Sequence, residues 1–142
     1  MIREVPVDPA KALYEAAGQR NGFIGLIGTV NAGKTPLLNQ LTVTLKEIGN
    51  QKVMYAELLA DARVNLEKFL KSDCTVLVLR EFRDISKTGI HQLLEVSQRK
   101  TVVAGLHPGC EHAIVKANFG VPVRFIELLR PDDLSPNEAG AA

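Results

Sequence analysis

The sequence has few aromatic residues and only two cysteines. Phe, Tyr and Trp make up 5% of the 142 residues, and Trp is absent. This scarcity argues against a platform of aromatic side chains that stacks on the bases of a single strand. Cys74 and Cys110 are too few for a disulfide framework or a four-cysteine zinc site, and pairing Cys110 with His112 would supply only two metal ligands. The two thiols are best interpreted as buried structural groups.

The sequence also lacks an excess of either charge and any long apolar run. Seventeen Lys and Arg against sixteen Asp and Glu leave a net charge of +1, which gives no direct nucleic-acid signal. The longest apolar stretches, such as 76–79, have the length of a strand and not of a transmembrane segment. The N-terminus has no apolar run typical of a signal peptide. These absences predict a cytoplasmic protein.

What is present is the composition of a globular domain. Hydrophobic residues make up 46% of the chain and charged residues 23%, which suffices for a core without disulfide or metal support. We expect one domain over residues 1–130. Residues 131–142 have little apolar surface to bury and are expected to form a flexible C-terminal tail.

Apolar runs of strand length alternate with segments of helical periodicity. Strands are predicted at 22–27, 52–56, 74–79, 101–106 and 121–128, and helices at 8–18, 33–48, 62–70, 89–98 and 111–118. This alternation predicts an α/β fold with a mainly parallel sheet of about five strands, covered on both faces. In such folds, ligands bind at the carboxyl ends of the strands.

Segment 28–35 reads GTVNAGKT and matches the phosphate-binding pattern G-x-x-x-x-G-K-[ST] between a predicted strand and a predicted helix. Glycines allow a tight turn, and the amides at the start of the helix donate to phosphate oxygens. The Lys is expected to reach the β- and γ-phosphates, and the Thr hydroxyl to bind Mg²⁺. The predicted cofactors are ATP and Mg²⁺, and the predicted nucleotide-binding residues are Gly28, Asn31, Ala32, Gly33, Lys34 and Thr35.

Polar side chains follow three other predicted strands. These are Glu57, Glu81 and His107, which a parallel sheet would bring to the edge that carries the phosphate loop. A carboxylate there can orient an attacking water or hold Mg²⁺ through a water, and a histidine can respond to the γ-phosphate. Each could also be an ordinary solvated residue at a strand end. Their coincidence favours the catalytic interpretation, with Glu81 as the residue that holds Mg²⁺ through water.

The order of these motifs resembles the motor domain of the type II and type IV secretion and pilus-retraction ATPases. In that family an apolar strand is followed by Gly-Glu-x-Arg-Asp, and here segment 79–84 reads LREFRD. The family's histidine box reads Thr-Leu-His-Thr, and here segment 105–108 reads GLHP. The resemblance covers about residues 8–119. It implies a three-layer, RecA-like P-loop NTPase core in which Glu81 is the Walker B glutamate, Glu57 matches the acidic box and His107 matches the histidine box.

The resemblance also implies partners. Relatives form hexameric rings, so it implies a homo-oligomer, or a partner protein of a membrane-associated machine, and a location that includes the inner face of a membrane. Relatives usually carry a separate N-terminal domain, for which we expect no room within these 142 residues. The sequence also departs from the family in carrying Pro36 after Thr35 and Arg80 where relatives have Gly. Arg63, Arg80 and Arg83 are the candidates for an arginine finger.

Three functions remain open at this point. The first is Mg²⁺-dependent ATP hydrolysis that is coupled to assembly or movement in a secretion-type machine. The second is a nucleotide-binding assembly module without hydrolysis, which Pro36 and Arg80 favour. The third is a small-molecule kinase, which the phosphate loop permits but for which no acceptor-binding motif is visible.

Overall fold

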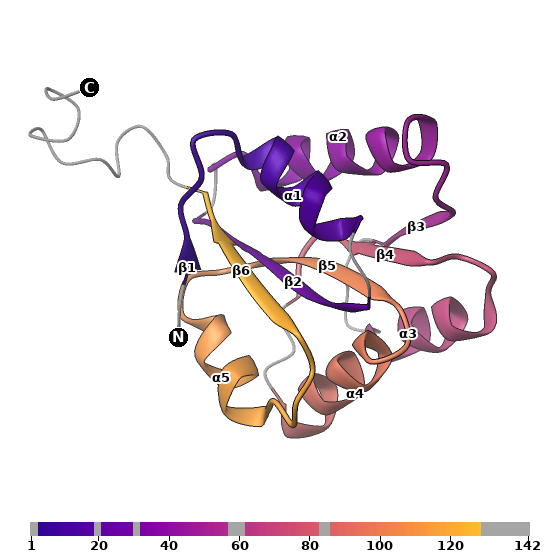
Figure 1. Cartoon of the computed structure of the whole chain (residues 1–142). Coiled ribbons are helices and arrows are strands. Elements are labelled where there is room, and N and C mark those ends of the chain that lie inside the picture. Colours follow the sequence, from indigo (N-terminus) through magenta and orange to yellow (C-terminus); the bar gives the residue numbers. More distant parts are fainter. Residues whose placement is uncertain (1–2, 19–20, 30–31, 57–61, 83–85, 129–142) are drawn as a thin grey trace, which may run out of the picture.

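The structure is a computed structural model, and it describes residues 3–18, 21–29, 32–56, 62–82 and 86–128. Five helices alternate with six strands in the described part of the chain (Figure 1). The strands are β1 Arg3–Glu4, β2 Gly22–Ile27, β3 Val53–Ala56, β4 Val76–Leu79, β5 Thr101–Leu106 and β6 Val123–Glu127. The helices are α1 Pro9–Ala17, α2 Lys34–Glu47, α3 Ala62–Lys71, α4 Lys87–Ser97 and α5 Cys110–Ala117.

The strands form one sheet in the order β1-β6-β2-β5-β4-β3, and every pairing is parallel. The predicted α/β class is therefore confirmed, and each of the ten predicted elements is present with ends that differ by no more than two residues. The sheet has six strands and not about five, and the strand that was not predicted is β1. That strand has only two residues, and Glu4 accepts two hydrogen bonds of 2.9 Å from Arg124 of β6.

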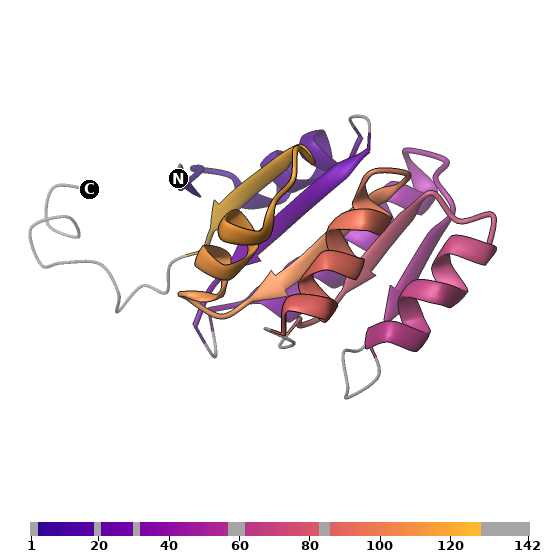
Figure 2. The ribbon, with the colours of Figure 1, turned by 90° about the horizontal axis from the view of Figure 1, so that it is seen from below.

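The helices lie in two layers around the sheet. Helices α1 and α2 cover one face, and α3, α4 and α5 cover the other (Figures 1 and 2). Parallel crossovers are right-handed. From β2 the chain crosses the sheet through α2 to the edge strand β3, and it then comes back in the other direction through β4, β5 and β6. Because the direction reverses, α2 lies on one face of the sheet and the helices of the later connections lie on the other. The three layers of the prediction are present.

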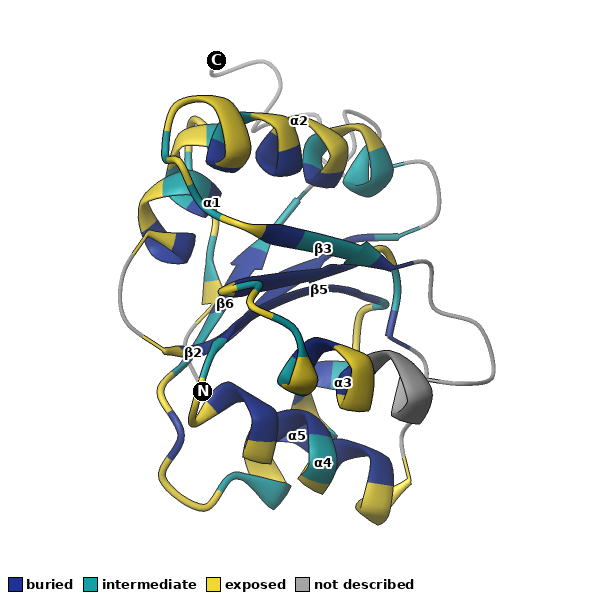
Figure 3. Ribbon diagram, turned by 90° about the vertical axis from the view of Figure 1, so that its right-hand side faces the viewer, coloured by how far each residue is buried: buried dark blue, intermediate teal, exposed yellow. Residues whose placement is uncertain are grey.

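Each layer has its own hydrophobic core. Leu38, Leu41 and Leu45 of α2 are buried on one side of the sheet, and Leu93 and Leu94 of α4 on the other. The helices are buried on the faces toward the sheet and exposed on the outer faces (Figure 3). β2, β4 and β5 are buried throughout, as expected for strands covered on both sides.

Local sequence signals fix several helix ends. Asp8 caps α1, since its Oδ1 accepts from the Lys11 amide at 3.1 Å, and Pro9 follows at the first helical position. Ser86 caps α4 in the same way through the Gly89 amide at 3.0 Å. Among the described residues, no helix has the length and apolarity that crossing a membrane requires.

Both cysteines carry free thiols and are half-buried against the core, rather than fully buried as expected. The described residues contain no group of three or more His, Cys, Asp or Glu side chains that could hold a metal ion. The tail expected over residues 131–142 lies outside the described residues.

Candidate nucleotide-binding site

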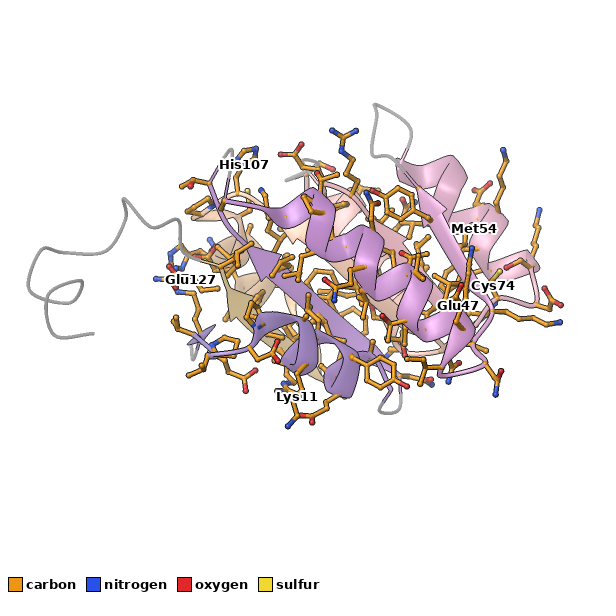
Figure 4. All side chains as sticks on the ribbon, turned by 90° about the horizontal axis from the view of Figure 1, so that it is seen from above. Lys11, Glu47, Met54, Cys74, His107 and Glu127 are labelled. Atoms are coloured by element: carbon orange, nitrogen blue, oxygen red, sulfur yellow. The ribbon has the colours of Figure 1, made fainter. Side chains whose placement is uncertain are left out.

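The strand order brings the predicted motifs to one edge of the sheet. The phosphate loop follows β2, Arg80 and Glu81 follow β4, and His107 follows β5, which lies between the other two strands. Figure 4 shows His107 at this carboxyl edge, together with Glu127 at the end of β6, whereas Glu47 and Cys74 lie at the opposite end of the molecule. Glu57 and Asn31 lie outside the described residues.

The loop leaves β2 through a close turn at Gly28. The Gly28 amide donates to the carbonyl of Leu106 at 3.1 Å, which ties the start of the loop to the end of β5. A Cβ at Gly28 would lie 3.2 Å from both Ala32 Cβ and Lys34 Cγ. This spacing is tighter than ordinary van der Waals contact, so the neighbouring atoms would have to shift by a few tenths of an ångström to admit a side chain. Because glycine has no side chain, the backbone at Gly28 can lie close to Ala32 and to the side chain of Lys34.

The loop enters α2 through Gly33, whose φ of +98° lies in the left-handed region that favours glycine. No side chain caps the helix that follows. The first amides of a helix have no partner within the helix, and without a cap they remain available to an anion. Pro36 is tolerated in the first turn because the amide that it lacks is one of these unpaired donors.

Lys34 lies over the end of β5. Its Nζ donates to the carbonyl of Leu106 at 3.2 Å, and the same carbonyl accepts from Gly28. The ammonium group is thus held at the mouth of the loop and half-buried, close to where the amides of α2 begin. The hydroxyl Oγ1 of Thr29 is buried nearby in sequence, and no described residue is hydrogen-bonded to it. A buried hydroxyl without a partner fits a loop that is completed by a bound ligand.

Glu81 and His107 contact each other through Oε1 and Nε2. Both side chains are partly exposed, at 23% for Glu81 and 33% for His107, so water and a ligand can reach them. The backbone holds the pair from both sides: the Phe82 amide donates to the Gly105 carbonyl at 2.8 Å, and the Cys110 amide donates to the His107 carbonyl at 3.1 Å. The sequence placed these two residues at one edge but did not indicate that they touch.

Arg80 points to a different part of the site. Its amide donates to the carbonyl of Ala56 at 2.9 Å, and its Nε lies 3.4 Å from Oγ1 of Thr35 in a long hydrogen bond. Arg80 is one of three candidates for an arginine finger, a residue that reaches a neighbouring subunit. The structure places it beside the phosphate loop of its own chain, and a role toward a neighbouring subunit stays a prediction. The other two candidates, Arg83 and the side chain of Arg63, lie outside the described residues.

The two residues that the sequence predicts to hold Mg²⁺, Thr35 and Glu81, both have side-chain partners in the structure. Mg²⁺ needs six oxygen ligands at about 2.1 Å, with carboxylates or waters completing the shell. Here the Thr35 hydroxyl faces a guanidinium group, and the Glu81 carboxylate contacts His107. A permanent positive charge beside the expected ligand opposes a second cation. The roles of Thr35 and Glu81 toward Mg²⁺ stay predictions.

Comparison with solved structures supports the fold. A crystal structure of a DNA replication initiation factor matches 84% of this chain with a TM-score of 0.56 and 17% sequence identity. The AMPPCP-bound structure of DnaA from Aquifex aeolicus matches 84% of this chain with a TM-score of 0.54 and 16% identity. The chain spans 44% of the length of each of these proteins.

This chain shares with these two structures an α/β fold, here with a six-stranded parallel sheet between two layers of helices. At such low identity the likeness shows the fold alone, and it does not single out the secretion ATPases among P-loop NTPases. No protein-family model matches the chain, and no curated protein matches it in sequence.

Two features of the site were not predicted from the sequence. One is the buried hydroxyl of Thr29, whose only sequence signal was its place within the phosphate-loop pattern. The other is the contact between Arg80 and Thr35, which depends on the order of strands that are distant in sequence. A charged residue in place of glycine after an apolar strand was the signal that could have pointed to it.

Proposed function

We propose that this chain binds a nucleoside triphosphate, with ATP as the first candidate, in the loop over residues 28–35. The observation that carries the proposal is the uncapped start of α2, entered through the left-handed Gly33 and followed at once by Lys34. An amide cluster, a helix dipole and a lysine held at one point are complementary to phosphate oxygens. The AMPPCP bound to DnaA, a structure with the same fold, supports this choice of ligand.

The test is thermal unfolding with and without ATP, in the wild type and in Lys34→Ala. A ligand at 100 times its dissociation constant should stabilise the folded wild type by about 2.7 kcal/mol. Lys34→Ala should lose most of this stabilisation. Lys46→Ala removes a lysine near the other end of the same helix and should behave as the wild type. Equal stabilisation of wild type and Lys34→Ala, or none in either, would contradict the proposal.

Hydrolysis of the bound nucleotide is the second candidate, and the contact between Glu81 and His107 favours it. In this reaction water attacks the γ-phosphorus, its proton passes to the Glu81 carboxylate, and the nucleoside diphosphate leaves with inorganic phosphate. Glu81 orients the water, and His107 holds Glu81 in place. Phosphate release should fall strongly in Glu81→Gln and not in Glu47→Gln, which changes a glutamate at the opposite end of the molecule. Phosphate recovered on a small-molecule acceptor would indicate a kinase instead.

Coupling of nucleotide state to assembly or movement in a secretion-type machine is a narrower hypothesis. It rests on the sequence resemblance of segments 79–84 and 105–108. If the chain works as part of a ring, turnover per chain should rise with protein concentration, and light scattering should detect a nucleotide-dependent oligomer. A non-hydrolysing assembly module would form the oligomer without releasing phosphate.

A further inference from the structure

One buried charge lies close to the site and has no part in the proposed function. Among the residues that the structure describes, Glu111 is the only buried charged side chain, and 1% of it is exposed. Burying a carboxylate costs free energy unless hydrogen bonds and an opposite charge compensate for the lost water. An acidic residue in the first turn of α5 favours the helix, but an exposed side chain would serve equally well. The burial therefore calls for another explanation.

The carboxylate of Glu111 fixes the turn between His107 and α5. Its Oε2 accepts from the Gly109 amide at 2.8 Å. Gly109, the N-cap of α5, has a φ of +99°, in the left-handed region that favours glycine. The Cys110 amide closes the same turn by donating to the His107 carbonyl at 3.1 Å. The backbone that carries the His107 side chain is thus held from both ends of the turn.

A cation from the edge strand faces the other oxygen of Glu111. Its Oε1 lies 3.7 Å from Nη1 of Arg3 in β1, and the same nitrogen lies 3.3 Å from Oε2 of Glu127 at the end of β6. The exposed side chain of His112 lies 3.8 Å from the same Oε1. With one oxygen on a backbone amide and the other toward Arg3, the buried carboxylate has a defined orientation.

The turn that Glu111 holds places His107 against Glu81. The two side chains meet across the ends of β4 and β5. Strand β5 ends at Leu106, which is paired with Ile27 of β2, and Leu106 also accepts the hydrogen bonds that tie down the phosphate loop. A shift of the turn would therefore move the imidazole and leave the sheet and the loop in place. An effect on the contact with Glu81 is separable from an effect on nucleotide binding.

We infer that Glu111 is a positioning residue for the contact between His107 and Glu81. It acts through its hydrogen bond to the Gly109 amide, which fixes the turn that carries the imidazole. Arg3 balances the buried charge, so the short strand β1 also supports the site. The inference rests on the proposed hydrolysis, in which His107 holds Glu81 in place.

The first test is a double-mutant cycle on phosphate release from ATP. Glu111→Ala should lower kcat by about tenfold or more and leave KM unchanged, since misplacement of a catalytic group by about 1 Å costs up to about a hundredfold. Glu111→Gln keeps an acceptor for the Gly109 amide and should retain most of kcat. In a His107→Ala background, Glu111→Ala should have no further effect on kcat, because Glu111 acts through His107.

Ser97→Ala is the control for a general loss of stability. Ser97 is buried, and its hydroxyl donates to the Leu93 carbonyl at 2.8 Å in α4, which leads into the start of β5. Its replacement should lower stability and leave kcat unchanged. Glu111→Met fills the buried space without a carboxylate, so it should lose as much of kcat as Glu111→Ala and replaces that variant if alanine prevents folding. Circular dichroism verifies the fold of each variant.

The second test needs neither nucleotide nor turnover. In the ligand-free protein, the ¹⁵N chemical shift of His107 Nε2 reports the contact with Glu81, and Glu81→Gln gives the value for a weakened contact. Glu111→Ala should move the shift toward that value. Glu111→Gln and Ser97→Ala should match the wild type.

The outcomes separate this inference from the proposed hydrolysis. If the wild type releases phosphate and Glu111→Ala does so at the same rate, or lowers kcat equally with and without His107, the inference is wrong and hydrolysis stands. If the wild type releases no phosphate, hydrolysis fails and the Nε2 shift decides the role of Glu111. An unchanged shift in Glu111→Ala then contradicts the inference, and a changed shift supports it.

Discussion

Glu81 and His107 touch across the ends of two neighbouring strands, β4 and β5. The contact joins a carboxylate and an imidazole that are 26 residues apart in the sequence, at the edge of the sheet where the phosphate loop begins. A carboxylate that is held by a second side chain has a defined orientation, which general-base chemistry requires. Because β4 and β5 are neighbours in the sheet, the two side chains can meet, and the proposed hydrolysis uses this contact.

Replacing His107 with Ala should separate catalysis from binding. Glu81 would lose the contact that orients it, so phosphate release should fall by about tenfold or more, since general acid–base catalysis contributes on the order of a hundredfold or more. ATP affinity should change little, because the hydrogen bonds of Gly28 and Lys34 to the Leu106 carbonyl do not use the His107 side chain and remain in place. Steady-state kinetics and a separate binding titration measure the two quantities.

The matched control for this variant is His91→Ala. His91 is an exposed histidine of α4 with its own glutamate partner, Glu95, four residues along the helix. Its removal should leave phosphate release unchanged. If His107→Ala weakens binding and turnover to the same extent, the residue has a structural role, and the assignment of Glu81 as an oriented base loses its support.

Gly105→Ala should destabilise the fold and disturb the site. A Cβ at Gly105 would collide with the carbonyl of Arg80, and this neighbour is backbone between two paired strands and has no room to move. Overpacking of this kind costs roughly 1–3 kcal/mol. Chemical denaturation should show the loss, and AMPPCP binding should weaken if the shift of Arg80 disturbs its contact with Thr35.

Gly18→Ala provides the comparison. Gly18 ends α1 with φ of −79°, which any residue adopts, and a Cβ there would lie 3.4 Å from the nearest atom, the Tyr14 carbonyl oxygen. We expect a change of no more than about 1 kcal/mol in its free energy of unfolding. Equal stability losses in the two variants would show that the close approach of β4 and β5 is not what constrains Gly105.

The elements of this fold follow from local patterns, but the contacts of the site follow from strand order. Apolar runs such as Val76–Leu79 and glycine at a helix start, as at Gly33, act within a few residues, so the sequence predicts them. The contact of Arg80 with Thr35 requires that only β5 lie between β4 and β2 in the sheet. The spacing of apolar residues along the chain does not determine this order of strands. Strand β1 was missed for the same reason, since its stability comes from pairing with β6.

Glu111, which follows His107 in the chain, is another residue whose contacts could not be predicted from local sequence patterns. The sequence places it in the first turn of a helix, where an acidic residue is favourable, but its side chain is 99% buried. Its Oε2 accepts from the Gly109 amide at 2.8 Å, and its Oε1 lies 3.7 Å from Arg3 of β1. Burial of the carboxylate depends on β1, which is distant in sequence. Glu111 therefore ties the start of α5 to the edge strand.

Removing this carboxylate should cost stability. Glu111→Ala leaves the Gly109 amide without its acceptor and leaves Arg3 with Glu127 as its remaining carboxylate partner, and a loss of about 2 kcal/mol in the free energy of unfolding is expected. Glu111→Gln keeps an acceptor for Gly109 and should lose less. Urea denaturation of both variants measures the difference. If the two variants lose the same amount, the charge toward Arg3 matters and the hydrogen bond to Gly109 does not.

The ion pair between Lys52 and Asp73 gives the fold a dependence on acid. Lys52 at the start of the β3 segment donates to Asp73 before β4, and this contact lowers the pKa of Asp73 below its usual value of 3.8. A carboxyl group with a lowered pKa in the folded state stabilises the fold above its ordinary pKa, and the effect is lost as the pH falls through the lowered value. Asp73→Asn should therefore have a lower Tm than the wild type at pH 6, and the difference should shrink as the pH falls below 3.8 and vanish once the pH is below the lowered pKa of Asp73.

Both side chains of this pair are exposed, so the effect is small and salt should screen it. Thermal unfolding of wild type and Asp73→Asn across the acid range, at low and high salt, is the measurement. Asp8→Asn is a suitable control, because it replaces a carboxylate with an amide while keeping the cap of α1 through an acceptor oxygen. A difference in Tm that persists unchanged at low pH would mean that Asp73 acts through its shape and hydrogen bonding, and not through the charge that Lys52 attracts.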